Sequence, residues 1–171
     1  MDAAPCRAYL GAMSETWLLP LAVMAATVAA MEILAALVHR YVMHGWGWAL
    51  HRSHHEPRRG RFELNDLYAL PFAALSLLFF SVLARSWPLL WWVGAGTAVY
   101  GILYAAVHDG LVHRRMPFPA VPRRGYLKRL VQAHRLHHAV RSREGAVSFG
   151  FLWAPSPKRL RRRLRAQGIA R

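Results

Sequence analysis

The stretch "WLLPLAVMAATVAAMEILAALVHRYVMHGWGWALHRSHH" (residues 17–55) joins an apolar run directly to a dense set of histidines. Its first part, residues 17–38, has 22 residues and one charged side chain, Glu32. A helix of about this length crosses the ~30 Å hydrocarbon core of a bilayer. The stretch therefore predicts a membrane helix that ends where five histidines begin.

Two further apolar runs, residues 67–84 and 89–107, are separated only by "RSWP". So short a connection predicts a helical hairpin that crosses the membrane twice. The piece "AVSFGFLWAP" (146–155) is too short to span alone, and it leaves a fourth membrane helix or a re-entrant segment open. The predicted fold class is an all-α integral membrane protein with three or four transmembrane helices. A length of 171 residues fits one domain over the whole chain, 1–171.

The positive charges lie mainly on one side of this arrangement. Of 23 Lys and Arg residues, one precedes the first run, one lies in the hairpin turn, five lie between the first two runs and sixteen follow the third. The positive-inside rule then places the N-terminus outside and both histidine-rich segments in the cytoplasm, at the cell inner membrane. Topology and attraction to anionic lipid explain the net charge of +15, so no nucleic-acid partner is expected. The basic tail, 158–171, is assigned to the lipid surface, with docking of an acidic electron donor as the alternative.

The histidines form a pattern that occurs twice. Residues 39–55 read H-x4-H and then H-x2-H-H, and residues 108–138 repeat both motifs. Each half begins at the end of a membrane run, and both halves fall on the side that the charges make cytoplasmic. The histidines were not used to derive that topology, so their convergence supports it independently. The ten histidines are His39, His44, His51, His54, His55, His108, His113, His134, His137 and His138.

The spacing predicts one-sided groups of imidazoles. On an ideal helix, the members of an H-x2-H-H motif fall within an arc of roughly 100°, so three imidazoles can bind a metal from one side. The members of an H-x4-H motif stand about 140° apart. Either the helix is distorted or unwound there, or the two histidines bind different metals. Gly45 after His44, and Pro117 after His113, favour a break near the second histidine.

These residue types point to metal chemistry. Neutral imidazole binds iron, zinc and copper, and the single cysteine, Cys6, excludes a thiolate cluster. Ten histidines exceed the four ligands of a structural zinc site and suit two metals with four or five ligands each. Unrelated or pH-sensitive histidines would not repeat in this way. A nitrogen-rich dimetal site at a membrane surface favours iron and oxygen chemistry on a lipophilic substrate, because iron changes oxidation state and zinc does not.

The chain resembles the membrane fatty-acid hydroxylase and desaturase superfamily in its histidine motifs. Its stretches "MEILAALVHRYVMHGWGWALHRSHHEPRRGRFELNDLYAL", "HDGLVHRRMPF", "PRRGYLKRLVQAHRLHHAV" and "GAVSFGFLWAP" are similar to those of bacterial beta-carotene 3-hydroxylases, over about residues 31–157. The resemblance implies a non-haem diiron monooxygenase whose iron ligands are drawn from the ten histidines. It implies hydroxylation of carbon 3 of the beta-ionone rings of beta-carotene, giving beta-cryptoxanthin and then zeaxanthin. O2 and reduced ferredoxin are the implied co-substrate and electron donor, and ketolated carotenoids are further candidate substrates.

Several other residues are candidates for supporting roles. Glu32 is expected to line a substrate cavity, orient a ligand or make a polar contact between helices, and the last is favoured. Tyr104 shares a face with His108 and is expected to border the cavity or to pack. Asp109 could hydrogen-bond a ligating imidazole. Asn65 and Asp66 are interpreted as a helix N-cap rather than as metal ligands.

Three alternative functions remain open at this point. A fatty-acid or sterol hydroxylase, or a desaturase, uses similar histidine clusters and differs in its products. A haem-binding membrane cytochrome would carry paired histidines within the spans, and a Soret band would reveal it. A zinc or nickel transporter would place polar ligands along the spans, where only Glu32 qualifies.

Overall fold

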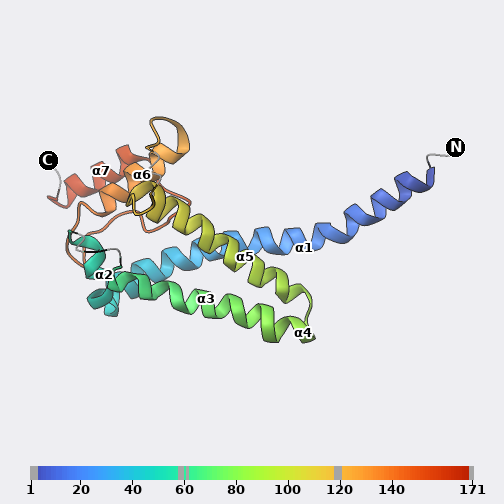
Figure 1. Cartoon of the computed structure of the whole chain (residues 1–171). Helices are drawn as coiled ribbons and strands as arrows, with labels where there is room; N and C mark the ends of the chain where they lie inside the picture. Colours follow the sequence, from blue (N-terminus) through green and yellow to red (C-terminus); the bar gives the residue numbers. More distant parts are fainter. Residues whose placement is uncertain (1–3, 58–59, 61, 118–120, 170–171) are drawn as a thin grey trace.

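The computed structural model describes residues 4–57, 60, 62–117 and 121–169, and side chains from Trp17 onward. Every regular element of this described part is helical, as predicted (Figure 1). The elements are α1 (Ala4–Leu37), the π-helix η1 (Val38–Trp46), α2 (Trp48–His55), the 3-10 helix η2 (Leu64–Tyr68), α3 (Ala69–Leu78), the π-helix η3 (Phe79–Leu83), α4 (Ala84–Ser86), α5 (Leu89–Tyr104), the π-helix η4 (Ala105–Val112), α6 (Gly125–His137) and α7 (Pro157–Ala166).

Three continuous helical stretches are long and apolar enough to cross a membrane. They are Trp17–Trp46, Leu64–Ser86 and Leu89–Val112. Large apolar side chains such as Ile33 and Ile102 are exposed on their outer faces, as a lipid environment allows. The three predicted spans are therefore confirmed, and each is longer than predicted because η1, η2, α4 and η4 extend the helices.

The segment 146–155, called the strap below, is not a fourth span. It contains no helix and lies against α1 and the histidines. A fourth membrane helix was one option for this segment, and that option is wrong because the segment is not helical. Three of its apolar residues, Val147, Phe151 and Ala154, are buried in the protein core, whereas Trp153 is exposed.

The membrane helices approach closely at small residues. A Cβ built on Gly96 of α5 would lie 2.6 Å from Cβ of Thr27 and 2.8 Å from the carbonyl oxygen of Met24, both on α1. Ser76 Oγ on α3 donates a 2.9 Å hydrogen bond to the carbonyl oxygen of Gly94 on α5. Close packing and polar links of this kind hold helices together where lipid provides no hydrophobic driving force between them.

Helices α6 and α7 and the strap cover one end of the bundle, away from the N-terminus (Figure 1). Leu160 and Leu164 of α7 are fully buried in a core that includes Leu130 and Ala133 of α6. The apolar stripe of the basic tail therefore packs against the protein and is not available to the bilayer. The tail forms the expected amphipathic helix, and what α7 presents outward is positive charge.

Candidate metal centre

The two H-x4-H motifs lie on π-helices. At the end of η1 the backbone N–H of Gly47 donates a hydrogen bond to the carbonyl oxygen of Val42 at 2.8 Å. At the end of η4 the backbone N–H of His113 donates one to the carbonyl oxygen of His108 at 2.9 Å. Both bonds span five residues, so side chains five apart come onto one face. The imidazole centroids are 5.3 Å apart for His39 and His44, and 4.5 Å apart for His108 and His113.

The expected helix distortion is therefore confirmed, but it takes a different form from a simple break. Each π-turn extends over the whole motif and keeps both histidines in one cluster, which reconciles the five-residue spacing with a shared site. A local departure from helical geometry does follow the second histidine of η1, at Gly45 (φ −107°, ψ −125°).

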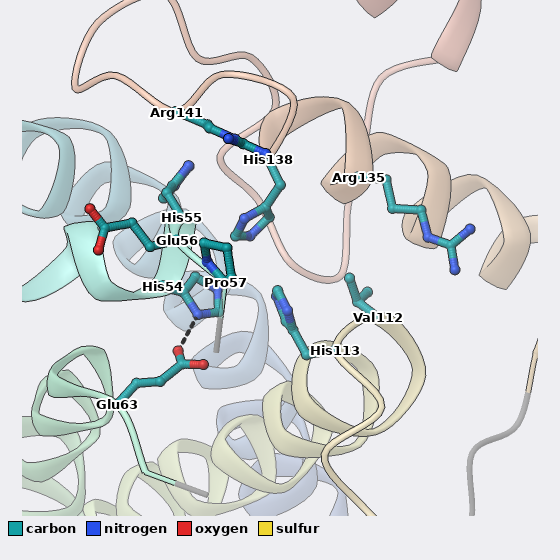
Figure 2. Close-up of a pocket in the computed structure, with 10 residues that line it drawn as sticks. All are labelled: His54, His55, Glu56, Pro57, Glu63, Val112, His113, Arg135, His138 and Arg141. Carbon is teal, nitrogen blue, oxygen red and sulfur yellow. Dashed lines mark hydrogen bonds and ion pairs between the residues drawn. The ribbon is translucent and has the colours of Figure 1, made fainter. Parts of the chain in front are cut away.

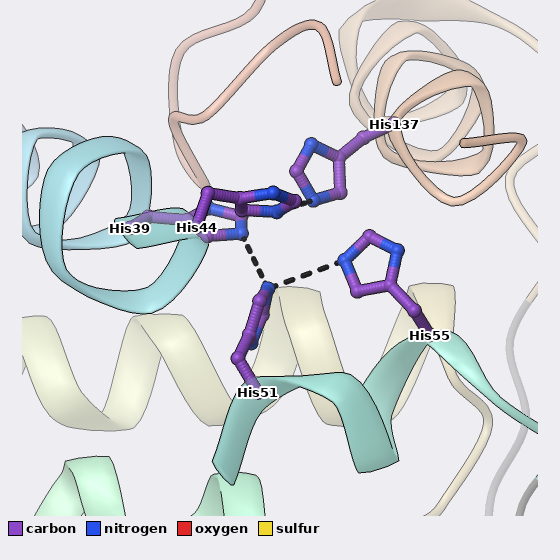
Figure 3. Close-up of side chains that lie close together, drawn as sticks. All are labelled: His39, His44, His51, His55 and His137. Carbon is purple, nitrogen blue, oxygen red and sulfur yellow. Dashed lines mark hydrogen bonds between the residues drawn. The ribbon is translucent and has the colours of Figure 1, made fainter. Parts of the chain in front are cut away.

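Nine histidines gather into two clusters, and the tenth lies against one of them. Within each cluster, one nitrogen from each ring lies within 4.8 Å of the others. We call the first the inner cluster because all its members are buried (Figure 3); it comprises His39, His44, His51, His55 and His137. We call the second the outer cluster, comprising His54, His108, His113 and His134, with His138 Nε2 2.9 Å from His134 Nε2.

Each half of the sequence contributes one histidine to the other half's cluster. His54 belongs to the first half but lies with the outer cluster, where its Nε2 is 3.0 Å from that of His108. His137 belongs to the second half but lies with the inner cluster, 3.2 Å from His44. In both H-x2-H-H motifs the crossing residue is the middle histidine. The two clusters are thus built jointly, and neither half of the pattern makes a complete site.

The imidazoles of the inner cluster are oriented by neutral oxygen atoms. Each donates a hydrogen bond from Nδ1, at 2.7 to 3.1 Å. The five acceptors are the carbonyl oxygens of Phe149, Arg143, Val140 and Val147 and the side-chain oxygen of Asn65.

Two imidazoles of the outer cluster are oriented by carboxylates instead. His54 Nδ1 lies 2.7 Å from Glu63 Oε2, a contact drawn in Figure 2. His108 Nδ1 lies 2.8 Å from Asp109 Oδ1. In these seven rings, then, Nδ1 donates the proton to an oxygen, which leaves Nε2 with a lone pair.

The Nε2 atoms are close enough to one another for a cation to bind between them. Six pairs of them lie 2.9 to 3.2 Å apart. Where Nδ1 holds the proton, two such atoms cannot hydrogen-bond to each other, and their lone pairs repel. Nitrogens bound to one ion at ~2.1 Å stand ~3.0 Å apart at right angles and ~3.4 Å apart in a tetrahedron. The donor set therefore fits metals with five or six ligands better than tetrahedral zinc.

Burial keeps the imidazoles outside the membrane spans in the neutral, metal-binding form. Desolvation lowers the pKa of His51 to about 3 and that of His55 to about 4. The same cause lowers the pKa values of His134 and His137 well below the ordinary value, helped by neighbouring histidines. Protons therefore do not compete strongly for these nitrogens at neutral pH.

Asn65 is a functional candidate that the sequence interpretation missed. The residue was expected to cap a helix, but its side chain accepts the Nδ1–H of His51 at 2.7 Å. The N-cap is instead Glu63, and Asp66 completes its capping box as the third helical residue, where its carboxylate accepts the backbone N–H of Glu63 at 3.0 Å. Asp66 also pairs with Arg115, which reaches Asp109 at 3.4 Å. Asn65 lies 14 residues after His51 in the sequence, and this separation gives no sign of a contact until the chain is folded.

Glu32 makes the polar contact between helices that was favoured, and it does more. Its Oε2 accepts the hydroxyl of Tyr100 on α5 at 2.8 Å. Its Oε1 accepts the backbone N–H groups of Phe151, Leu152 and Trp153 at 2.9, 3.0 and 2.9 Å. The carboxylate therefore anchors the strap to α1, and its contacts are with the strap and α5 rather than with an imidazole.

An apolar cavity of about 830 Å³ lies between α1, α3 and α5. Tyr104 borders this cavity, which was one of the two expectations for it. Its ring also stacks on His108, with centroids 4.6 Å apart. From Thr97 to Asp109 the lining covers ~18 Å along the helix. The cavity ends at polar residues that contact the clusters, Asn65 and Asp109, and no histidine of the described chain lines it.

A second, polar pocket of about 450 Å³ lies on the other side of the outer cluster (Figure 2). Its walls include His113 and His138, the two histidines that are not fully buried. Arg135, Arg141 and Glu56 also line it. The clusters thus lie between an apolar cavity and a polar pocket, so a lipophilic molecule and a water-soluble one can approach from different sides.

Comparison with known proteins agrees with this site. The sequence model of the family described as fatty acid hydroxylase matches residues 24–155. The chain is 57% identical to a beta-carotene hydroxylase of Pantoea ananas, over 91% of this chain and 89% of that protein. It is 61% identical to one of Pseudescherichia vulneris, over 81% and 79%, and 38% identical to the chloroplastic beta-carotene 3-hydroxylase 2 of Arabidopsis thaliana, over 73% and 42%. No solved structure matches the chain.

The two histidine clusters could hold metal ions, and the relatives support an enzyme that hydroxylates beta-carotene. The chain belongs to the fatty acid hydroxylase family and, within it, groups with the bacterial beta-carotene hydroxylases.

Proposed function

We propose that the protein hydroxylates carbon 3 of the beta-ionone rings of beta-carotene, giving beta-cryptoxanthin and then zeaxanthin. The observation that carries the proposal is the apolar cavity of about 830 Å³ that ends at the two histidine clusters. A hydrocarbon ring has no hydrogen-bonding group, so its selection in this mostly apolar cavity must come from shape. Relatives named for this activity at 57% and 61% identity support the substrate.

The ten histidines are the proposed ligands of two iron ions, one in each cluster. His138 completes the outer set, because its Nε2 lies beside that of His134. Each cluster would then offer five imidazoles to its ion. When bound, the irons would supply oxygen activation and removal of a ring hydrogen.

The chain itself orients the imidazoles, excludes water and gives the electron donor access to the site. Nδ1 acceptors hold the imidazoles, as Asn65 does for His51 and Asp109 for His108. Burial of the inner cluster keeps water away from the reacting carbon. One oxygen atom of O2 enters the C–H bond and the other leaves as water, which requires two electrons and two protons. Reduced ferredoxin is the proposed donor, and the polar pocket beside His113 and His138 offers it a route.

The proposed location is the cell inner membrane, with the N-terminus outside and the clusters in the cytoplasm. The distribution of Lys and Arg supports this orientation, since sixteen of the 23 follow the third membrane run. Reporter fusions at the two chain ends should give opposite responses, and equal responses would contradict the orientation.

The test is pigment analysis of cells that accumulate beta-carotene. Cells with the intact chain should contain beta-cryptoxanthin and zeaxanthin. A variant with His54→Ala and His137→Ala removes the two crossing histidines and should leave beta-carotene unchanged. Unchanged beta-carotene with the intact, iron-loaded protein in the membrane would refute the substrate, and fatty acids and sterols would then be assayed with the same protein.

A further inference from the structure

The side chain of Phe151 separates the apolar cavity from both clusters. It lines the cavity and is buried. On its other side its ring stacks on His39 of the inner cluster, with centroids 5.1 Å apart and planes at 13°. It also contacts His108 and His134 of the outer cluster, at 5.4 and 6.0 Å. A ring that enters the cavity therefore meets Phe151 where the two clusters come together.

Phe151 has no helix to hold it, because the strap is irregular. Its position depends on Glu32, whose Oε1 accepts the three consecutive backbone N–H groups of Phe151, Leu152 and Trp153. A Cβ on Gly150 would lie 2.7 Å from that same oxygen, so glycine allows the close approach. This accounts for an acidic residue inside the first membrane span, where an unpaired carboxylate would be costly.

The shape of the proposed substrate makes the position of Phe151 important for the choice of carbon. In a beta-ionone ring the polyene is attached at carbon 6, and carbon 3 is the ring atom opposite it. A ring that enters end-on presents carbon 3 first and carbons 2 and 4 beside it. These positions are equally apolar, so the depth and tilt at which the ring stops decide which carbon faces the metals.

We propose that Phe151 is the stop against which the ring rests, and that Glu32 is the positioning residue that fixes this stop through the strap. The proposal rests on the proposed function and deepens it, because it assigns the choice of carbon 3 to particular side chains. Tyr104 supports the stop from the side, with its ring 4.7 Å from that of Phe151 in an edge-to-face contact.

The first experiment measures the position of hydroxylation in the full-length, iron-loaded protein. Phe151→Leu and Phe151→Met shorten or loosen the stop and should raise the ratio of 2- and 4-hydroxylated to 3-hydroxylated rings at least ten-fold. Phe79→Leu is the matched control. Phe79 is a partly buried phenylalanine of η3 that does not line the cavity, so the product of this variant should stay at carbon 3. Product at carbon 3 alone from both Phe151 variants, or loss of all product with iron content unchanged, would overturn the proposal.

The second experiment tests the bonds between Glu32 and the strap without an activity assay. It measures amide hydrogen exchange in the metal-free protein. Glu32→Ala removes all three strap bonds and should speed exchange at Phe151, Leu152 and Trp153 at least ten-fold, whereas Glu32→Gln keeps an acceptor and should change it less. Tyr100→Phe removes only the bond to α5 and should leave these amides protected. Unchanged exchange in Glu32→Ala would contradict the anchor. Because this measurement uses no substrate, it separates failure of the anchor from failure of the carotenoid assignment.

Discussion

Glu63 Oε2 lies 2.7 Å from Nδ1 of His54, and this contact makes the two clusters chemically different. The outer cluster has a second carboxylate contact, from Asp109 to His108, whereas all five inner imidazoles donate to neutral oxygens. A carboxylate partner raises the donor strength of an imidazole. Two metals bound here should therefore differ in affinity and in the ease with which they are reduced.

Replacing Glu63 should weaken the outer metal selectively. Glu63→Gln keeps the shape but removes the charge beside His54, and the affinity of the outer cluster should fall ~10–100-fold. Competition with a chelator, followed by iron analysis, should show one of two ions lost early. Glu56→Gln is the control, because Glu56 is half-exposed and pairs with Arg52 one turn away. Equal loss of both ions from Glu63→Gln would contradict the assigned difference.

The π-turn in η1 should be essential to the inner cluster. Inserting one alanine after Tyr41 would put five residues between His39 and His44 where the π-turn accommodates four, and the extra residue would rotate His44 by about 100°. Iron content of the purified protein should fall by about one ion per chain. Tyr41→Ala keeps the spacing, and Tyr41 is 60% exposed, so this control should retain its iron. Full iron content in the insertion variant would show that the spacing set by the π-turn is dispensable.

The sequence predicted most of the architecture because its signals are local. Long apolar runs identified the spans, and the repeated histidine motifs identified the metal-binding ends. Partners brought together by folding could not be predicted in this way. The contact between Glu32 and the strap joins residues 119 to 121 positions apart, and the exchange of His54 and His137 between clusters depends on how α2 and α6 pack. The five-residue spacing left two interpretations open because an ideal α-helix cannot satisfy it.

Acid should destabilise the metal-free protein more than a protein without buried imidazoles. Burial lowers the pKa of His51 to about 3 and that of His55 to about 4, while in the unfolded chain both return to about 6.5. Between these values the unfolded state binds more protons, so this stability is present above pH 6.5 and is lost as the pH falls toward 4. Thermal unfolding of metal-free protein in detergent should therefore shift downward from pH 7.5 to 5. In a variant with His51→Asn and His55→Asn the shift should be smaller, and an equal shift would contradict this origin.

The close contact of α1 and α5 should make Gly96 intolerant of even one methyl group. In Gly96→Ala the new Cβ would meet Cβ of Thr27 at 2.6 Å and the carbonyl of Met24 at 2.8 Å, so the helices must move apart. Overpacking of this kind costs ~1–3 kcal/mol, which should lower the unfolding temperature by several degrees. Gly101→Ala lies on the same helix with nothing within 4 Å, and it should be neutral or gain up to ~1 kcal/mol from helix propensity. Equal unfolding temperatures for the two variants would show that this interface adapts to the added methyl group.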